Sequence, residues 1–158
     1  MIKVGMADLN ICHSPDAITT LGLGSCVGVA LYDKTTCTAG LVHVMLPDST
    51  KVRQNQNRAK FADTGIDWLL EMLAKEGVNR RSLTAKIAGG AQMFAFKSDN
   101  EMLRVGERNV EAVKNKLNSL GIRILAEDTG LNYGRTVEFY PETGDFVIKS
   151  VGKPIKTI

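Results

Sequence analysis

Two consecutive segments, CVGVALY at residues 26–32 and TAGLVHVML at residues 38–46, are rich in β-forming residues and flank a short polar turn. This pattern predicts a β-hairpin with two apolar faces. One face would carry Val27, Val29, Leu31, Val42, Val44 and Leu46, and the other Gly28, Ala30, Ala39 and Leu41. Because a sheet that is apolar on both sides must be covered on both sides, we expect a three-layer sandwich, with helices on one face and further strands on the other.

The remaining segments supply helices and strands for such a sandwich. Apolar residues recur with helical spacing from Phe61 to Leu73 and from Val110 to Leu120, and a glycine follows each stretch. Shorter strands are expected at residues 2–8, 17–21, 84–88 and 122–126, and as a hairpin at 136–140 and 145–151. Tight turns between neighbouring strands predict mixed, largely antiparallel sheets with two main helices, an α/β (α+β) fold. The length of 158 residues predicts one domain, 1–158.

The composition excludes several classes of function. A net charge of +3 gives no dense basic stripe, so we expect no nucleic-acid partner. The N-terminus lacks the apolar core of a signal peptide and no apolar run could span a bilayer, so we expect a cytoplasmic protein without membrane insertion. Three cysteines without a short Cys-x-x-Cys pair predict free thiols rather than disulfides or a zinc site. We expect neither a metal nor a cofactor.

A glycine-rich turn, TTLGLGSCV at residues 19–27, places Cys26 at the start of the hairpin. If the hairpin is symmetric, with Asp33 opposite Thr36, then Cys26 lies directly opposite His43 on one face of the sheet. A register slip of one residue would separate the two side chains. In this geometry a His43 imidazolium would favour the Cys26 thiolate, a nucleophile for carbonyl carbon. The alternative is that both are ordinary core residues.

Three residues near this turn are candidates for supporting roles. A tight turn at Gly24 and Ser25 could aim backbone amides of Ser25 and Cys26 at one point and form an oxyanion hole. Thr20, on the strand that enters the turn, could orient the histidine. Read alone, this threonine would be an ordinary strand residue.

Later segments contain weaker candidates for substrate or partner contact. Gly89 and Gly90 follow a buried strand, which indicates either close backbone approach near a site or a tight turn. Phe94 and Phe96 could form a partner surface or could belong to the core. Arg135 is expected at the surface or in an ion pair.

Several of these motifs, in this order, resemble one known family. TTLGLGSCVGVALYD, AGLVHVMLP, KIAGGAQMF, VGERN and AEDTG are similar to segments of the CheD family, the chemoreceptor glutamine deamidases of chemotaxis. The resemblance covers most of the chain and implies an α/β sandwich related to bacterial toxin deamidases, with a papain-like catalytic arrangement. It also implies that Cys26, His43 and Thr20 are the catalytic residues.

The resemblance further implies an activity and partners. Family members hydrolyse selected glutamine side chains of methyl-accepting chemotaxis receptors to glutamate and release ammonia through a thioester on the cysteine. They also bind and stimulate a CheC-type phosphatase of the response regulator. Two alternatives remain open at this point: a module whose main role is to regulate that phosphatase, and a cysteine amidase or peptidase of other specificity.

Overall fold

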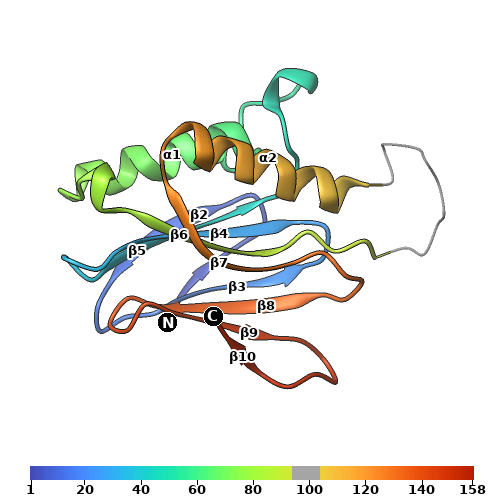
Figure 1. The fold of residues 1–158 in the computed structure, drawn as a ribbon. Helices are drawn as coiled ribbons and strands as arrows, with labels where there is room; N and C mark the ends of the chain where they lie inside the picture. The colour runs from blue at the N-terminus through green and yellow to red at the C-terminus, as the bar shows by residue number, and fades with distance from the viewer. Residues whose placement is uncertain (94–103) are drawn as a thin grey trace.

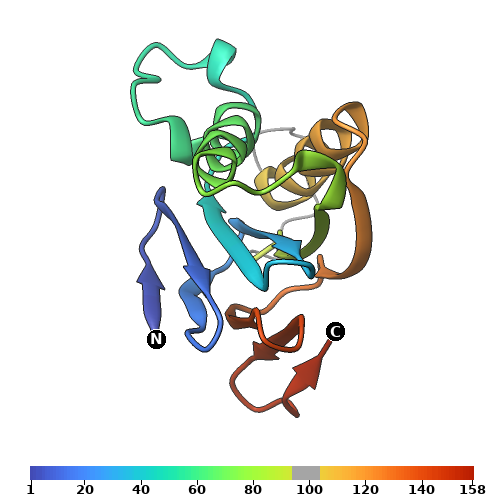
Figure 2. The same ribbon diagram turned by 90° about the vertical axis from the view of Figure 1, so that its left-hand side faces the viewer.

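The computed structural model describes residues 1–93 and 104–158, and in these residues two five-stranded sheets and two α-helices stack in three layers (Figure 1). The outer sheet has the order β1 (Ile2–Val4), β3 (Ile18–Leu23), β8 (Arg135–Tyr140), β9 (Asp145–Lys149) and β10 (Lys156–Thr157). The helix-covered sheet has the order β2 (Leu9–His13), β5 (Thr38–Val44), β4 (Val27–Asp33), β6 (Thr84–Gly89) and β7 (Arg123–Thr129). Helices α1 (Ala62–Lys75) and α2 (Val105–Ser119) lie side by side on the far face of the second sheet (Figure 2).

The sheets are mixed, as the sequence predicts. Only β1–β3 and β6–β7 are parallel pairs in the described residues, and the other pairs are antiparallel. Both predicted helices are present, whereas the sequence pattern does not predict β2 or β10. The alternation at residues 2–8 suggests one strand, but the chain turns after Val4 and begins β2 at Leu9. No helix in the described residues is long and apolar enough to cross a membrane.

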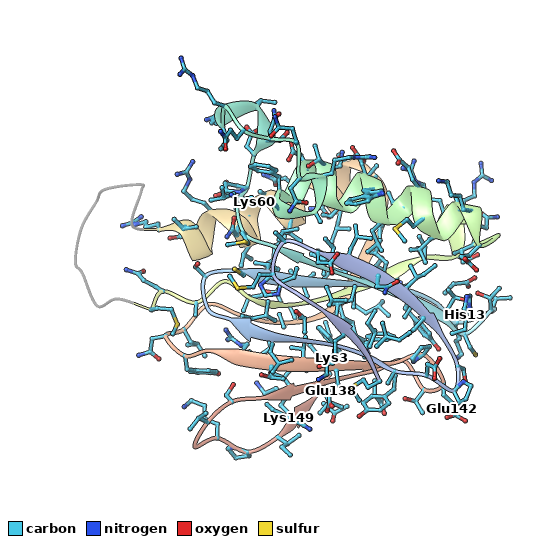
Figure 3. The ribbon with its side chains drawn as sticks, turned by 180° about the vertical axis from the view of Figure 1, so that it is seen from behind. Lys3, His13, Lys60, Glu138, Glu142 and Lys149 are labelled. Carbon is cyan, nitrogen blue, oxygen red and sulfur yellow. The ribbon has the colours of Figure 1, made fainter. Side chains whose placement is uncertain are left out.

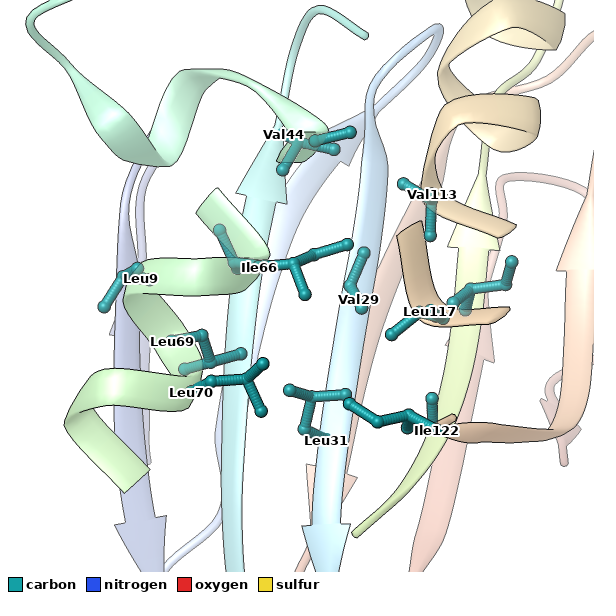
Figure 4. Packing of buried hydrophobic residues seen from close by; sticks show 14 of the residues in the cluster. Leu9, Val29, Leu31, Val44, Ile66, Leu69, Leu70, Val113, Leu117 and Ile122 are labelled. Atoms are coloured by element: carbon teal, nitrogen blue, oxygen red, sulfur yellow. The ribbon is translucent and has the colours of Figure 1, made fainter. Parts of the chain in front are cut away.

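The two faces of the β4–β5 hairpin pack against different layers, as the sequence predicts, although Leu46 lies beyond the end of β5 and in neither apolar cluster. Val27, Val29, Leu31, Val42 and Val44 lie in the apolar cluster beneath the helices (Figure 4). Ala30, Ala39 and Leu41 lie in the cluster between the two sheets. The hairpin is therefore the middle layer of the molecule.

The register of this hairpin differs from the symmetric prediction. Asp33 pairs with Thr38, not Thr36, because the connecting loop contains the four residues 34–37. The Asp33 carboxylate holds this loop by accepting hydrogen bonds from the Thr35 amide and the Thr36 hydroxyl. Cys37 closes the loop in the left-handed region, at φ 49°. A wider loop moves every cross-strand pair by two residues, and His43 consequently faces Gly28 rather than Cys26.

The exposed face of the outer sheet is polar. Lys149 forms an ion pair of 2.8 Å with Glu138, and Lys3 lies on the same side of the sheet (Figure 3). This face borders solvent. The opposite face of the outer sheet packs on the hairpin through the apolar cluster between the sheets.

Candidate active site

Cys26 lies where the chain crosses from one sheet to the other. Strand β3 belongs to the outer sheet and β4 to the helix-covered sheet, and residues 24–26 connect them. The pairing of β3 with β8 is irregular between Thr20 and Leu23, and Gly22 there has φ 73°, a left-handed conformation that glycine adopts without strain. The crossing leaves the Cys26 side chain 7% exposed, close to the surface but largely covered.

Cys26 and His43 share one face of the helix-covered sheet although they are not directly opposed. His43 is opposite Gly28, and Gly28 follows Cys26 by two residues, so all three point to the same side. The observed register differs from the predicted register by two residues. A shift of two residues leaves each side chain on the same face of the sheet, whereas a shift of one residue would move it to the other face. Cys26 lies one residue before the paired part of β4, and it belongs to the apolar cluster between the two sheets, the interior in which His43 meets Thr20. Gly28 puts no side chain between Cys26 and His43.

Thr20 contacts His43 from the opposite sheet. The Thr20 Oγ1 atom lies 2.7 Å from His43 Nδ1 and 2.8 Å from the Val4 carbonyl oxygen. Its hydroxyl proton is donated to that carbonyl, so the oxygen accepts a hydrogen bond from the Nδ1–H of the ring. This fixes the tautomer: Nε2 carries the free lone pair and has no hydrogen-bond partner among the described residues.

Burial keeps the candidate pair neutral at rest. His43 is fully buried, which lowers the pKa of its imidazole to about 4. Burial also raises the pKa of the Cys26 thiol, an effect that its own backbone amide partly offsets. At neutral pH these shifts favour a thiol beside an imidazole with a free Nε2, rather than the imidazolium–thiolate pair suggested by the sequence. No hydrogen bond joins Nε2 to the Cys26 thiol among the described residues, and a neutral imidazole with a free Nε2 is the form of the ring that can act as a general base.

The Gly89–Gly90 segment contacts the backbone of the Cys26 loop. Gly90 N donates to the Cys26 carbonyl at 2.8 Å, and Ala91 N donates to the Gly24 carbonyl at 2.8 Å. Both glycines have positive φ, and a Cβ on Gly89 would overlap the Cys26 carbonyl oxygen. Of the two interpretations of this glycine pair, the structure supports close backbone approach.

Other predicted residues are placed as follows. The Gly24 amide donates to the Gly22 carbonyl at 3.1 Å, which leaves the Ser25 and Cys26 amides as the candidate oxyanion donors. Met93 packs on Gly24, with its Cγ 3.3 Å from where a Cβ on that glycine would lie. Phe94 and Phe96 lie outside the described residues.

Two buried polar residues lie near the site; the ion pair predicted for Arg135 is confirmed, whereas Asn109 is missed by the sequence analysis. Arg135 is in an ion pair, at 3.1 Å from Asp128, but it is 2% exposed rather than at the surface. Its guanidinium also donates to the carbonyls of Gly89 and Gly130. Asn109 on α2 donates to the carbonyls of Ser25 and Met45. The available signal for Asn109 is its spacing, since it stands four residues before Val113 on the buried stripe of the helix.

A cavity of about 590 Å³ lies beside this region but does not contain the candidate pair. Its lining includes Gly90, Val110, Lys114, Thr129 and Leu131, from α2 and the ends of β6 and β7. The Cys26 carbonyl touches one wall through Gly90. Neither Cys26 nor His43 lines this cavity, so the cavity is not the place of the proposed chemistry.

The fold and site define a mixed α/β sandwich with a buried thiol and imidazole at the crossing between two sheets. A solved structure shares the fold, the crystal structure of hypothetical protein YfiH from Bacillus licheniformis. It matches with a TM-score of 0.50 and 17% identity over 79% of this chain and 51% of that chain. This similarity concerns the fold alone.

Sequence comparison identifies the family. Residues 45–150 match the family described as CheD chemotactic sensory transduction. The chain is 70% identical to a probable chemoreceptor glutamine deamidase CheD of Lachnoclostridium phytofermentans, over 100% of this chain and 98% of that protein. It is 51% identical to the chemoreceptor glutamine deamidase CheD of Bacillus subtilis, over 100% of this chain and 96% of that protein. The chain belongs to the CheD family.

Proposed function

We propose that this protein is a chemoreceptor glutamine deamidase that converts selected receptor glutamines to glutamate and releases ammonia. The full-length similarity to deamidases of the family supports the reaction class. The observation that carries the chemistry is the Thr20–His43 hydrogen bond, because it leaves Nε2 unprotonated on the face that Cys26 shares. The reaction then requires a carboxamide carbon near the thiol and the approach of the thiol to His43 Nε2.

In the first half of the reaction, His43 Nε2 takes the Cys26 proton as Sγ attacks the carboxamide carbon. The carbonyl oxygen becomes an oxyanion, for which the Ser25 and Cys26 amides are the proposed donors. The imidazolium is stabilised by its Nδ1–H bond to Thr20. It then gives the Nε2 proton to the departing nitrogen. The C–N bond breaks, ammonia leaves and a thioester remains on Cys26.

In the second half, water hydrolyses the thioester. His43 Nε2 removes a proton from the water while its oxygen attacks the thioester carbon, and the C–S bond then breaks. The proton returns to the thiolate, so the enzyme is restored and glutamate is released. These steps balance without a redox partner or a cofactor.

The proposal extends to the setting of the enzyme. The whole chain acts as one cytoplasmic domain with a papain-like arrangement similar to that of toxin deamidases, and methyl-accepting receptors are its substrates. Gly90 donates to the Cys26 carbonyl, and this proximity supports the proposal that Gly89 and Gly90 contact the substrate segment. A CheC-type phosphatase is the proposed protein partner, which the enzyme would bind and stimulate.

The experiment is mass spectrometry of receptor cytoplasmic fragments after incubation with the wild type, Cys26→Ala or Cys37→Ala. Conversion of glutamine to glutamate is expected with the wild type and with Cys37→Ala, whose thiol is in the β4–β5 loop. No conversion is expected with Cys26→Ala. Equal rates for Cys26→Ala and the wild type would refute the mechanism. Absence of conversion with every protein, together with stimulation of the phosphatase, would favour the regulatory alternative.

A further inference from the structure

The β4–β5 hairpin opens into a fork beside Cys26. Its last pair is Val27 with Val44, and continuation would place Cys26 opposite Met45. Instead the two strands diverge and take different partners. The Cys26 carbonyl accepts from Gly90 N, whereas the amides of Met45 and Leu46 both donate to the Lys60 carbonyl. The nucleophile loop and the end of the His43 strand therefore have no direct ladder bond beyond Val44.

One side chain spans this fork. Asn109 of α2 is fully buried, and its Nδ2 donates to the Ser25 carbonyl at 3.0 Å and to the Met45 carbonyl at 2.9 Å. A carboxamide nitrogen has two N–H groups, and Asn109 uses one for each arm of the fork. Its Oδ1 is buried without a partner among the described residues. Two hydrogen bonds from one buried side chain therefore connect the two arms of the fork.

The N-terminal turn of α2 is packed closely enough for Asn109 to enter the fork. A Cβ on Gly106 would overlap the carbonyl oxygens of Gly90 and Ala91, so glycine there allows the helix to lie against this segment. Gly90 and Ala91 in turn donate to the carbonyls of Cys26 and Gly24. The helix, the glycine segment and the nucleophile loop thus form one continuous set of contacts.

We propose that Asn109 is a positioning residue that sets the separation between the Cys26 thiol and His43 Nε2. The inference deepens the proposed function, because it assumes that these two atoms exchange the catalytic proton. Backbone pairing does not fix the separation of these two atoms, because the ladder ends at Val27 and Val44 and no hydrogen bond joins the thiol to Nε2 among the described residues. The arms of the fork must be held at one spacing for the proton transfer to occur in each turnover. Asn109 supplies that constraint from outside both strands.

The test compares Asn109→Leu, which has a similar volume and no donors, with Asn118→Leu at an exposed position of the same helix. The first readout is kcat and KM for deamidation of a receptor fragment. The second is the rate at which iodoacetamide alkylates Cys26 between pH 5 and 9, followed by peptide mass spectrometry. Cys37 in the same samples serves as the internal reference, and His43→Gln defines alkylation without the base.

For Asn109→Leu we expect kcat to fall about 10- to 100-fold while KM stays within about threefold, because positioning acts on the chemical step. Its alkylation profile should coincide with that of His43→Gln, and the Asn118→Leu profile with that of the wild type. If Asn109→Leu does not fold, Asn109→Ala is used, since it removes the donors without adding bulk.

Two results would overturn the inference. One is a wild-type alkylation profile and wild-type kcat in a folded Asn109 variant that only melts at a lower temperature, which would make this residue a packing residue. The other is a change in KM alone. If the wild type itself does not deamidate receptor fragments, the proposed function fails, but the alkylation profiles still decide the role of Asn109.

Discussion

The two faces of the helix-covered sheet border interiors of different character. The interior beneath α1 and α2 is built from apolar side chains such as Val29, Ile66 and Leu117 (Figure 4). The interior between the sheets also has an apolar cluster, but Thr20, His43 and Arg135 are buried within or beside it. The same strands, β4 and β5, contribute to both.

Three buried side-chain atoms of the described residues have no hydrogen-bond partner. Among the described residues these atoms are His43 Nε2, Arg135 Nη2 and Asn109 Oδ1. Two come from strands β5 and β8, and the third belongs to the side chain that binds the Cys26 loop. Each such group costs about 1–3 kcal/mol when buried without a partner. Two of the three unpaired groups, His43 Nε2 and Arg135 Nη2, thus belong to strands that border the interior between the sheets.

The largest effect should come from removing the base. His43→Gln eliminates the free Nε2 lone pair, and we expect kcat for deamidation to fall about a thousandfold. The free energy of unfolding at pH 7 should change little by comparison. Measurement requires steady-state ammonia release and urea unfolding on the same preparations. A variant with more than a tenth of the wild-type kcat would remove His43 from the mechanism.

The second-largest effect is expected on the free energy of unfolding, with no change in kcat. Leu69 of α1 is fully buried and packs against Gly40 of β5, so Leu69→Ala leaves a cavity beneath the helices. We expect a loss of about 3 kcal/mol in the free energy of unfolding. The kcat per folded molecule should match the wild type, and Leu125→Ala, at an exposed position, serves as the control. A proportional fall in kcat would mean that the two interiors are not separable.

The sequence predicts the two faces of the β4–β5 hairpin but not its register. Hydrophobic alternation identifies both hairpin faces, because side-chain direction depends only on the parity of position. The register depends on the loop at residues 34–37, where Asp33 side-chain hydrogen bonds and a left-handed Cys37 decide the length. No alternation pattern encodes these contacts. The sequence nevertheless predicts that Cys26 and His43 share a face, because the predicted register differs from the observed one by two residues and an even shift keeps side chains on the same face.

Thr20 and Asn109 show where prediction stops at the site. Thr20 is a candidate because it precedes the glycine turn, and its position on β3 brings it to His43. Asn109 bonds to two carbonyls that become available only because the strands diverge after Val44. That divergence depends on the partners of Cys26 and Met45, which are distant in sequence. A polar residue on a buried helical stripe is the available sign of such a role.

The smallest of the three effects concerns the dependence of stability on pH. The pKa of His43 is lowered by burial from 6.5 to about 4, so between these values the unfolded chain binds the proton more strongly than the folded chain. The contribution of neutral His43 to the free energy of unfolding is therefore present above about pH 6.5 and is lost as the pH falls toward 4. From these two pKa values we expect a loss of about 2 kcal/mol by pH 5 relative to pH 8.

Urea unfolding of the wild type and His43→Gln at pH 5 and pH 8 isolates this contribution, because the other titrating groups are common to both proteins. The wild type should lose more stability between the two pH values, by the amount due to His43. The same measurement with Leu69→Ala should give the wild-type dependence on pH, since its cavity lies in the helix-covered interior, away from the imidazole. Equal slopes for the wild type and His43→Gln would show that His43 accepts a proton without leaving the folded state, and that the interior between the sheets is wetter than its burial indicates.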